Sequence, residues 1–427
     1  MSAINIVILI SILVIIAIGY KTKINFGLIG IAFAFIFGCL LADMSVNSVL
    51  NQWPAKLFFQ MFTVTFFYAF AIKNGTLELF SKKVVYVAKN ATYLVPLLLF
   101  LTAGVLAGIG PGSVSIFLVL SPIVMQIAKE SDMHPALAGI SMVCGANSGG
   151  WSPIAVNGIT THGLIEASGF GGAEAADLTI VVWRNMIIAS VVIFVLSYFV
   201  FKGFKLKTLN FGKPAKFAKE QKVTLVLIII MSALLIFPAL LKGLGGPVEW
   251  LANKMDVTFL AIIFSVIAML LKIGNEKEAI LSVPWQTIIM VCGMGMIIGV
   301  AAQAGALEYL SNYIGDNISI AVIPYAVCLV AGVMSIFAST MGVVVPTLFP
   351  LIFAICAASG AAPGLLYSII PIAAGYTGLS PFSLTGGLIL AATEESKREK
   401  MFILMIVVAI CTLVVNLLMI ASGLLRN

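Results

Sequence analysis

Two stretches of hydroxyl, amide and glycine residues interrupt long apolar segments of the chain, and both have the same spacing. The first runs from Gly145 to Gly158, and the second, in the other half of the chain, from Ala373 to Gly386. Each contains a Ser-Pro pair and a glycine at the fifth position after the proline. Such sequence breaks a helix, which leaves unpaired N–H groups at one stump and unpaired carbonyl groups at the other. The N–H stump carries about +0.5 of a charge and suits a carboxylate, whereas carbonyl and side-chain oxygens suit Na⁺.

Two polar tips between apolar arms, Gly110–Ser113 and Ala338–Gly342, repeat in the same way. Paired breaks and tips inside apolar sequence indicate a binding centre, and we expect all four to converge near the midplane of a membrane. The alternative is that the small residues only permit close helix packing. The candidate substrate contacts are Ser113, Asn147, Ser148, Ser152, Asn157, Ser339, Thr340, Thr377, Ser380, Ser383 and Thr385.

The composition predicts an all-α polytopic membrane protein. Hydrophobic residues make up 61% of the 427 residues and charged residues only 10%, against about 25% charged in soluble domains. Apolar runs long enough to span a bilayer recur along the chain, which favours spanning helices over a barrel. The formal charge of +7 comes from basic residues in short loops between these runs, so it is a topology signal and does not indicate a nucleic-acid partner.

The repeat extends beyond the two breaks. Pro122 corresponds to Pro350 and Pro135 to Pro363, at the same offset that relates the breaks. The sequence therefore predicts two repeats with about ten spanning helices, two re-entrant hairpins and two broken helices. The predicted ranges are 1–201 for the first repeat (hairpin about 90–130, broken helix 135–160), 202–222 for a cytoplasmic linker, and 223–427 for the second repeat (hairpin about 317–358, broken helix 363–393).

The number of crossings and the placement of lysines predict that the two repeats are inverted. If both hairpins are re-entrant, five crossings separate equivalent elements, and an odd number reverses the second half. With both termini outside, the inside loops hold 19 of the 24 basic residues, whereas the loops 161–178 and 304–316 lie outside with none. We expect a multi-pass protein of the plasma (inner) membrane.

The sequence contains no recognisable catalytic set. The two histidines are His134 and His162, and HExxH, GxSxG and P-loop motifs are missing. No Asp or Glu lies in the middle of a predicted span, as the proton relay of a pump would require. We therefore expect neither an enzyme nor a cofactor.

Several motifs resemble the ion-transporter superfamily, and among its members the divalent-anion/sodium symporters and the malonate-carrier-type dicarboxylate permeases. The pattern Asn74–Glu78, then Gly110–Ser113, then Gly145–Pro153 is similar to the malonate-carrier type, and the likeness covers essentially the whole chain. The symporters carry a Ser-Asn-Thr tip in each hairpin. Here the second tip has Ser339-Thr340 without the asparagine, and the first lacks both asparagine and threonine.

The resemblance implies a homodimer with a fixed scaffold and a part that moves as an elevator. It also implies two Na⁺ sites, one from each half. By position these sites comprise Ser113, Gly145 and Asn147 in the first half and Ser339, Thr340 and Gly375 in the second.

We therefore expect a secondary active transporter of a small dicarboxylate such as malonate, malate or succinate, with Na⁺ as the coupling ion and the lipid bilayer as its environment. A proton-coupled or exchange carrier of another anion, including an arsenite- or citrate-type relative, remains an alternative within this class. From another class, the chain would be the membrane subunit of a multi-component transport complex.

Overall fold

The computed structural model describes residues 24–87, 91–206, 213–240, 254–306 and 319–427, together with nine residues between Val7 and Thr22. All regular structure in these ranges is helical, and no strand occurs in them. The protein is thus an all-helical polytopic membrane protein, as the composition predicts. In the described part of the chain five helices are long and apolar enough to cross a membrane, and five shorter apolar helices accompany them.

The helices of the first half fall into a leading group and a hairpin group. The leading helices are α2 (Phe26–Phe35) with its π-helical continuation (Ile36–Leu41), α3 (Val46–Leu50), α4 (Ala55–Lys73) and α5 (Thr76–Val87). The second group consists of a short 3-10 turn (Thr92–Leu94), α6 (Val95–Gly108), α7 (Gly112–Glu130), α8 (Pro135–Gly150), α9 (Val156–Ser168) and α10 (Gly172–Val200).

The described helices of the second half also fall into a leading group and a hairpin group. After a 3-10 turn (Gly203–Lys205), its leading helices are α11 (Lys219–Leu240), α13 (Val257–Leu270), α14 (Glu276–Ser282) and α15 (Trp285–Gln303). The hairpin group is α17 (Ile323–Phe337), the π-helical turn η5 (Thr340–Val344) that continues into α18 (Val345–Ser359), α19 (Pro363–Thr377), α20 (Leu384–Ala392) and α21 (Glu395–Ala421).

Helix starts in the two halves coincide at the offset that relates the sequence motifs. The starts of α6, α7, α8 and α9 precede those of α17, η5, α19 and α20 by this one constant offset. The common starts have a local cause. Proline is the first residue of α8 and of α19 and the second of α6 and of α17, where its missing N–H costs nothing.

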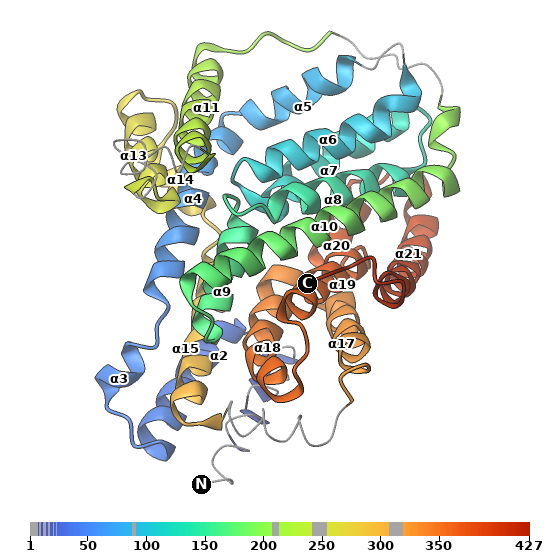
Figure 1. Cartoon of the computed structure of the whole chain (residues 1–427). Helices are drawn as coiled ribbons and strands as arrows, with labels where there is room; N and C mark the ends of the chain where they lie inside the picture. The colour runs from blue at the N-terminus through green and yellow to red at the C-terminus, as the bar shows by residue number, and fades with distance from the viewer. Residues whose placement is uncertain are drawn as a thin grey trace.

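The first hairpin, α6 and α7, packs against α8, and α10 lies beside them (Figure 1). The second hairpin packs on α19 in the same way, and α10 against α19 and α9 against α18 join the two halves. The leading helices pair across the halves, α2 with α15 and α4 with α13. Glycine permits the closest of these contacts, because a Cβ atom on Gly149 would lie 1.8 Å from the carbonyl oxygen of Gly104.

Some boundaries differ from those expected. The segment 161–178 is predicted to be a loop, but α9 continues to Ser168 and α10 begins at Gly172. The turn between them is made by Gly169, whose φ of +127° favours glycine. Most of the loop expected at 304–316 lies outside the described residues. The division into inverted repeats and the re-entrant nature of the hairpins stay predictions.

The contact between α6 and α8 generates a test of packing. We expect Gly149→Ala to destabilise the protein by about 1–3 kcal/mol, as overpacking of a tight interior does, because the new methyl group meets backbone that cannot rotate away. Thermal unfolding of the purified protein in detergent measures this effect as a lower Tm. The matched control is Gly387→Ala inside α20, where the nearest atom to the new Cβ lies 3.9 Å away. Equal Tm values for the two variants would contradict the packing argument.

Candidate functional site

The two helix breaks are built by the same backbone turn. The N–H of Ser152 donates to the carbonyl of Gly149 over 2.8 Å, and the N–H of Ser380 donates to that of Thr377 over 2.9 Å. The last residue of each motif must be glycine, since a Cβ atom on Gly158 or on Gly386 would lie 1.9 Å from the carbonyl oxygen of the Ser-Pro serine. The repeated motif therefore encodes a repeated non-helical turn.

The first hairpin is hydrogen-bonded directly to the first break. The N–H of Val156, the first residue of α9, donates to the carbonyl of Gly110 over 2.9 Å. The hydroxyl of Ser152 donates to the carbonyl of Gly108 over 2.9 Å. The side-chain amide of Asn157 donates to the hydroxyl of Ser113 over 2.7 Å. Three bonds thus hold the tip of the first hairpin on the first break.

The second hairpin is held by α19 rather than by the second break. The hydroxyls of Ser335 and Thr340 both donate to the carbonyl of Ala374, over 2.7 and 3.0 Å. Within the second break, the hydroxyl of Ser380 only accepts the N–H of Phe382, and that of Ser383 donates to the carbonyl of Gly378. Equivalent motifs in the two halves therefore engage their hairpins differently.

A small cavity of about 20 Å³ lies where both hairpin tips meet both broken helices. That volume holds about one water-sized group. The first residues of α7, of η5 and of α20 all contribute to its wall. Its lining contains no charged side chain and consists of Ser113, Val114, Phe117, Asn147, Trp151, Ser339, Thr340, Met341, Gly375, Ser383, Leu384 and Thr385. The starts of these helices bring partial positive charge to the cavity, whereas Asn147 and Gly375 belong to the last turns of α8 and α19, where the partial charge is negative.

Two donors in this lining have no partner. The Nδ2 atom of Asn147 and the Nε1 atom of Trp151 are buried and make no hydrogen bond in the described part of the chain. The two residues are 3% and 1% exposed, so bulk solvent does not reach these donors. Leaving a buried donor unpaired costs about 1–3 kcal/mol, and an acceptor entering the cavity would remove that cost.

The structure brings together six of the eleven candidate substrate contacts, namely Ser113, Asn147, Ser339, Thr340, Ser383 and Thr385. The other five lie beside the cavity without lining it. Ser148 and Thr377 donate their hydroxyls to carbonyls of their own helices, and Ser152, Asn157 and Ser380 make the bonds described above. Of the six candidate Na⁺ ligands, all but Gly145 line the cavity. Whether any of these residues binds substrate or Na⁺ stays a prediction.

Gly145 has a packing role in the structure. A Cβ atom there would lie 2.0 Å from the carbonyl oxygen of Phe100 on α6, and the carbonyl of Gly145 accepts the hydroxyl of Ser148.

The apolar lining residues Val114, Phe117, Met341 and Leu384 are not among the candidates that the sequence predicts. Their position in the sequence, next to the hairpin tips and the second break, could have indicated that they line the cavity.

Two family models match separate parts of the chain. Residues 1–150 match the N-terminus of the dicarboxylate carrier protein MatC, and residues 250–427 match a citrate transporter family. A search of curated proteins returned no match. Among solved structures, the YdaH transporter of Alcanivorax borkumensis is similar, with a TM-score of 0.58 and 11% identity over 88% of this chain and 87% of that one. At this identity the likeness shows the fold alone.

Both matched families are carriers of carboxylates, so the resemblance to the dicarboxylate permeases of the ion-transporter superfamily is confirmed. The chain is a multi-pass membrane transporter of the dicarboxylate or citrate type. The expectation that it is not an enzyme is confirmed by the same matches.

The different surroundings of the two motif serines generate a paired test of stability. We expect Ser152→Ala to cost about 1 kcal/mol or more, because the carbonyl of Gly108 loses its partner on another helix. Ser380→Ala at the equivalent position should cost less, since its bond lies within one turn. Chemical denaturation or thermal unfolding of the two variants checks the difference. A larger loss for Ser380→Ala would contradict the assignment of these bonds.

Proposed function

We propose that this carrier moves a small dicarboxylate by secondary active transport, with Na⁺ as the coupling ion. The observation that carries the proposal is the pair of unpartnered donors, Asn147 Nδ2 and Trp151 Nε1, in a cavity that three helix starts also border. Donors without acceptors suit a carboxylate, which accepts hydrogen bonds at both oxygens and donates none. Bonds to a charged acceptor are also stronger than those between neutral groups.

The helix starts support the same anion. Leu384 and Thr385 begin α20 and line the cavity, while Gly112 and Ser113 begin α7 and place Ser113 in the lining. Partial positive charge at these ends favours a carboxylate by about 0.3–1 kcal/mol each, more where the site is partly buried. The absence of lysine and arginine from this lining makes the helix ends and neutral donors the groups that would bind the anion.

Na⁺ coupling is supported by the oxygens of the same lining. Ser113, Ser339 and Thr340 place hydroxyl groups there from the two hairpin tips. The hydroxyl of Thr340 donates its proton to the carbonyl of Ala374, which leaves its lone pairs for a cation. One cation from each half would offset the two charges of a dicarboxylate.

Alternating access of the elevator type would provide the opening that a dicarboxylate needs, because the cavity holds only about one water-sized group. We assign the motion to the hairpin group α6–α10 and α17–α21, with α2–α5 and α11–α15 as the scaffold. Within the moving part we assign local opening to the second hairpin, since the first is bonded to its break at three places. A homodimer, which the resemblance implies, is part of this proposal.

Contacts between distant segments support the proposed orientation. Lys56 forms an ion pair with Glu166, both of which the lysine pattern places outside, and Lys129 forms one with Glu394, both placed inside. Asn74 likewise bonds to Thr224 on the inside. These contacts join residues that share a side, and the lysine pattern identifies which side is inside. On this basis we propose that both termini lie outside the plasma (inner) membrane.

The indole of Trp151 gives a sharp test of the site. Trp151→Phe removes an unpaired donor and keeps an aromatic ring, so we expect an unchanged or slightly higher Tm without ligand. We expect at the same time a tenfold or greater loss of affinity for the carboxylate, which corresponds to about 1.4 kcal/mol. Thermal-shift titration of the purified protein with malonate, succinate, malate and citrate measures both quantities.

The matched control is Trp285→Phe, because Trp285 does not line the cavity. Its Nε1 donates a hydrogen bond of 2.9 Å to the carbonyl of Ile280. This control should lower the Tm and leave affinity unchanged. Unchanged affinity in Trp151→Phe, with normal ligand response in the parent protein, would remove Trp151 from the site.

Ion coupling is tested in proteoliposomes that contain only this chain. We expect saturable uptake of a labelled dicarboxylate when an inward Na⁺ gradient is imposed, and loss of uptake when choline or Li⁺ replaces Na⁺. Uptake that persists with a pH gradient alone would overturn Na⁺ coupling. Absence of uptake despite ligand binding would instead favour a membrane subunit that needs partner proteins.

A further inference from the structure

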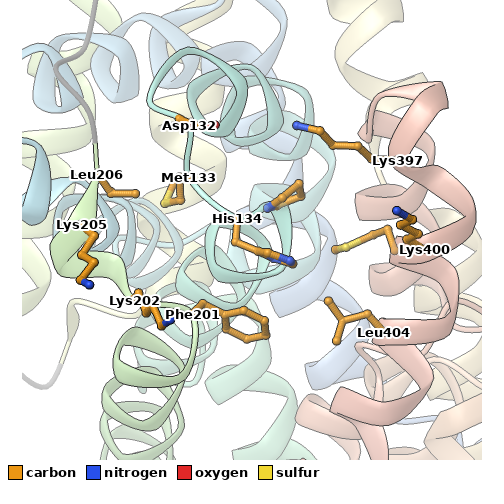
Figure 2. Close-up of a pocket in the computed structure, with 12 residues that line it drawn as sticks. Asp132, Met133, His134, Phe201, Lys202, Lys205, Leu206, Lys397, Lys400 and Leu404 are labelled. Atoms are coloured by element: carbon orange, nitrogen blue, oxygen red, sulfur yellow. The ribbon is translucent and has the colours of Figure 1, made fainter.

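A second and larger cavity, of about 510 Å³, opens where the turn between α7 and α8 meets the end of α10 and the start of α21. Figure 2 shows the side chains around it, with Lys202 and Lys205 on one side and Lys397 and Lys400 on the other. Lys202 and Lys205 follow the end of α10, whereas Lys397 and Lys400 lie near the start of α21. The packing of α21 against α8 and α10 brings the two pairs together.

The charge of this cavity is strongly positive. Four lysines face one acidic residue, Asp132, which gives the lining a formal excess of three positive charges. Lys397 forms an ion pair with Glu394 over 3.3 Å. In the part of the chain that the structure describes, Lys202, Lys205 and Lys400 form no ion pair. Like charges so gathered repel one another unless an anion lies between them.

The histidine in this cavity adds no charge at neutral pH. His134 stacks on Phe201 with ring centroids 4.8 Å apart, and its Nδ1 accepts the N–H of Ala136. Burial and the nearby charge of Lys397 lower the pKa of His134 below its usual value. The neutral imidazole then carries its proton on Nε2, which is a hydrogen-bond donor for an anion.

One wall of the cavity is apolar and continues onto exposed apolar surface. Phe201 and Leu404 lie low in the view of Figure 2, level with Lys202 and below Lys205, Lys397 and Lys400. Just beyond them, Phe199 and Val200 at the end of α10 are 63% and 70% exposed, and Ile403 of α21 is 59% exposed. Lysines above an apolar wall match a molecule with an anionic head and hydrocarbon chains, and a soluble anion would leave this wall unused.

We propose that this cavity, formed by Lys202, Lys205, Lys397 and Lys400 above Phe201 and Leu404, binds the phosphate headgroup of an anionic phospholipid. The headgroup phosphate lies among the lysines. The acyl chains lie along the exposed apolar residues at the end of α10 and the start of α21. The bound lipid offsets the repulsion between the two lysines that follow α10 and the two lysines of α21. It thereby stabilises the contact between α10 and α21, and it is distinct from the small carboxylate site.

The test uses the full chain in a neutral detergent, with phospholipid added in mixed micelles. Phosphatidylglycerol should raise the Tm by about 2–4 °C over phosphatidylcholine, as a ligand that binds the folded state does. In the variant Lys205→Gln with Lys400→Gln, at least half of this difference should be lost. The matched control, Lys219→Gln with Lys277→Gln, removes two exposed lysines elsewhere and should keep it.

Three outcomes would overturn the proposal: an equal shift with phosphatidylcholine, an equal shift with inorganic phosphate at the same phosphate concentration, or a full shift in the double variant. If the double variant does not fold, native mass spectrometry of Lys400→Gln replaces it. Fewer retained phosphatidylglycerol molecules than in the parent protein would support the site, and an equal number would overturn it. Carboxylate affinity should be unchanged in all these variants.

Discussion

The structure depends on one constraint, which is that backbone groups released from a helix inside apolar surroundings must find partners. The two broken helices are interrupted after Gly150 and after Thr377. At the first break the released N–H of Val156 bonds to the tip of a hairpin, and at the second the N–H of Gly386 returns to the carbonyl of Gly378. The glycines of both motifs permit this close approach of backbone to backbone.

The two halves solve this constraint unequally, and the inequality shapes the site. The side chains of Ser152 and Asn157 donate hydrogen bonds to the first hairpin, so the first break and the first hairpin are joined to each other. The donors of Asn147 and Trp151, by contrast, have no partner in the described structure. A tightly bonded first hairpin thus lies beside unpaired donors and a second hairpin with fewer bonds, which is the arrangement that the proposed anion site requires.

The two proposed sites would bind negative charge in two physically different ways. Around the small cavity, helix ends and neutral donors replace basic side chains, so a carboxylate is not held by a full opposite charge. Where α10 ends and α21 begins, lysines with full charge gather at an open cavity beside exposed apolar surface. Weak, directional donors fit cargo that must be released, whereas clustered full charges fit a resident anion.

Local sequence signals determined the helical class, the positions of both breaks and both tips, and the offset that relates them. Proline and glycine act on their own backbone, and for this reason Pro135, Pro363, Gly158 and Gly386 could be interpreted without knowing the fold. The local signals did not predict the extension of α9 to Ser168, because the hydroxyl, histidine and acidic residues there resemble a loop.

Only the tertiary structure decided which polar groups face the cavity. In a non-helical turn a side chain does not follow the helical period, so Ser383 lines the cavity while Ser380, earlier in the same turn, does not. Likewise, only the packing of α21 on α10 brings Lys400 to Lys205, since no local pattern relates residues so far apart.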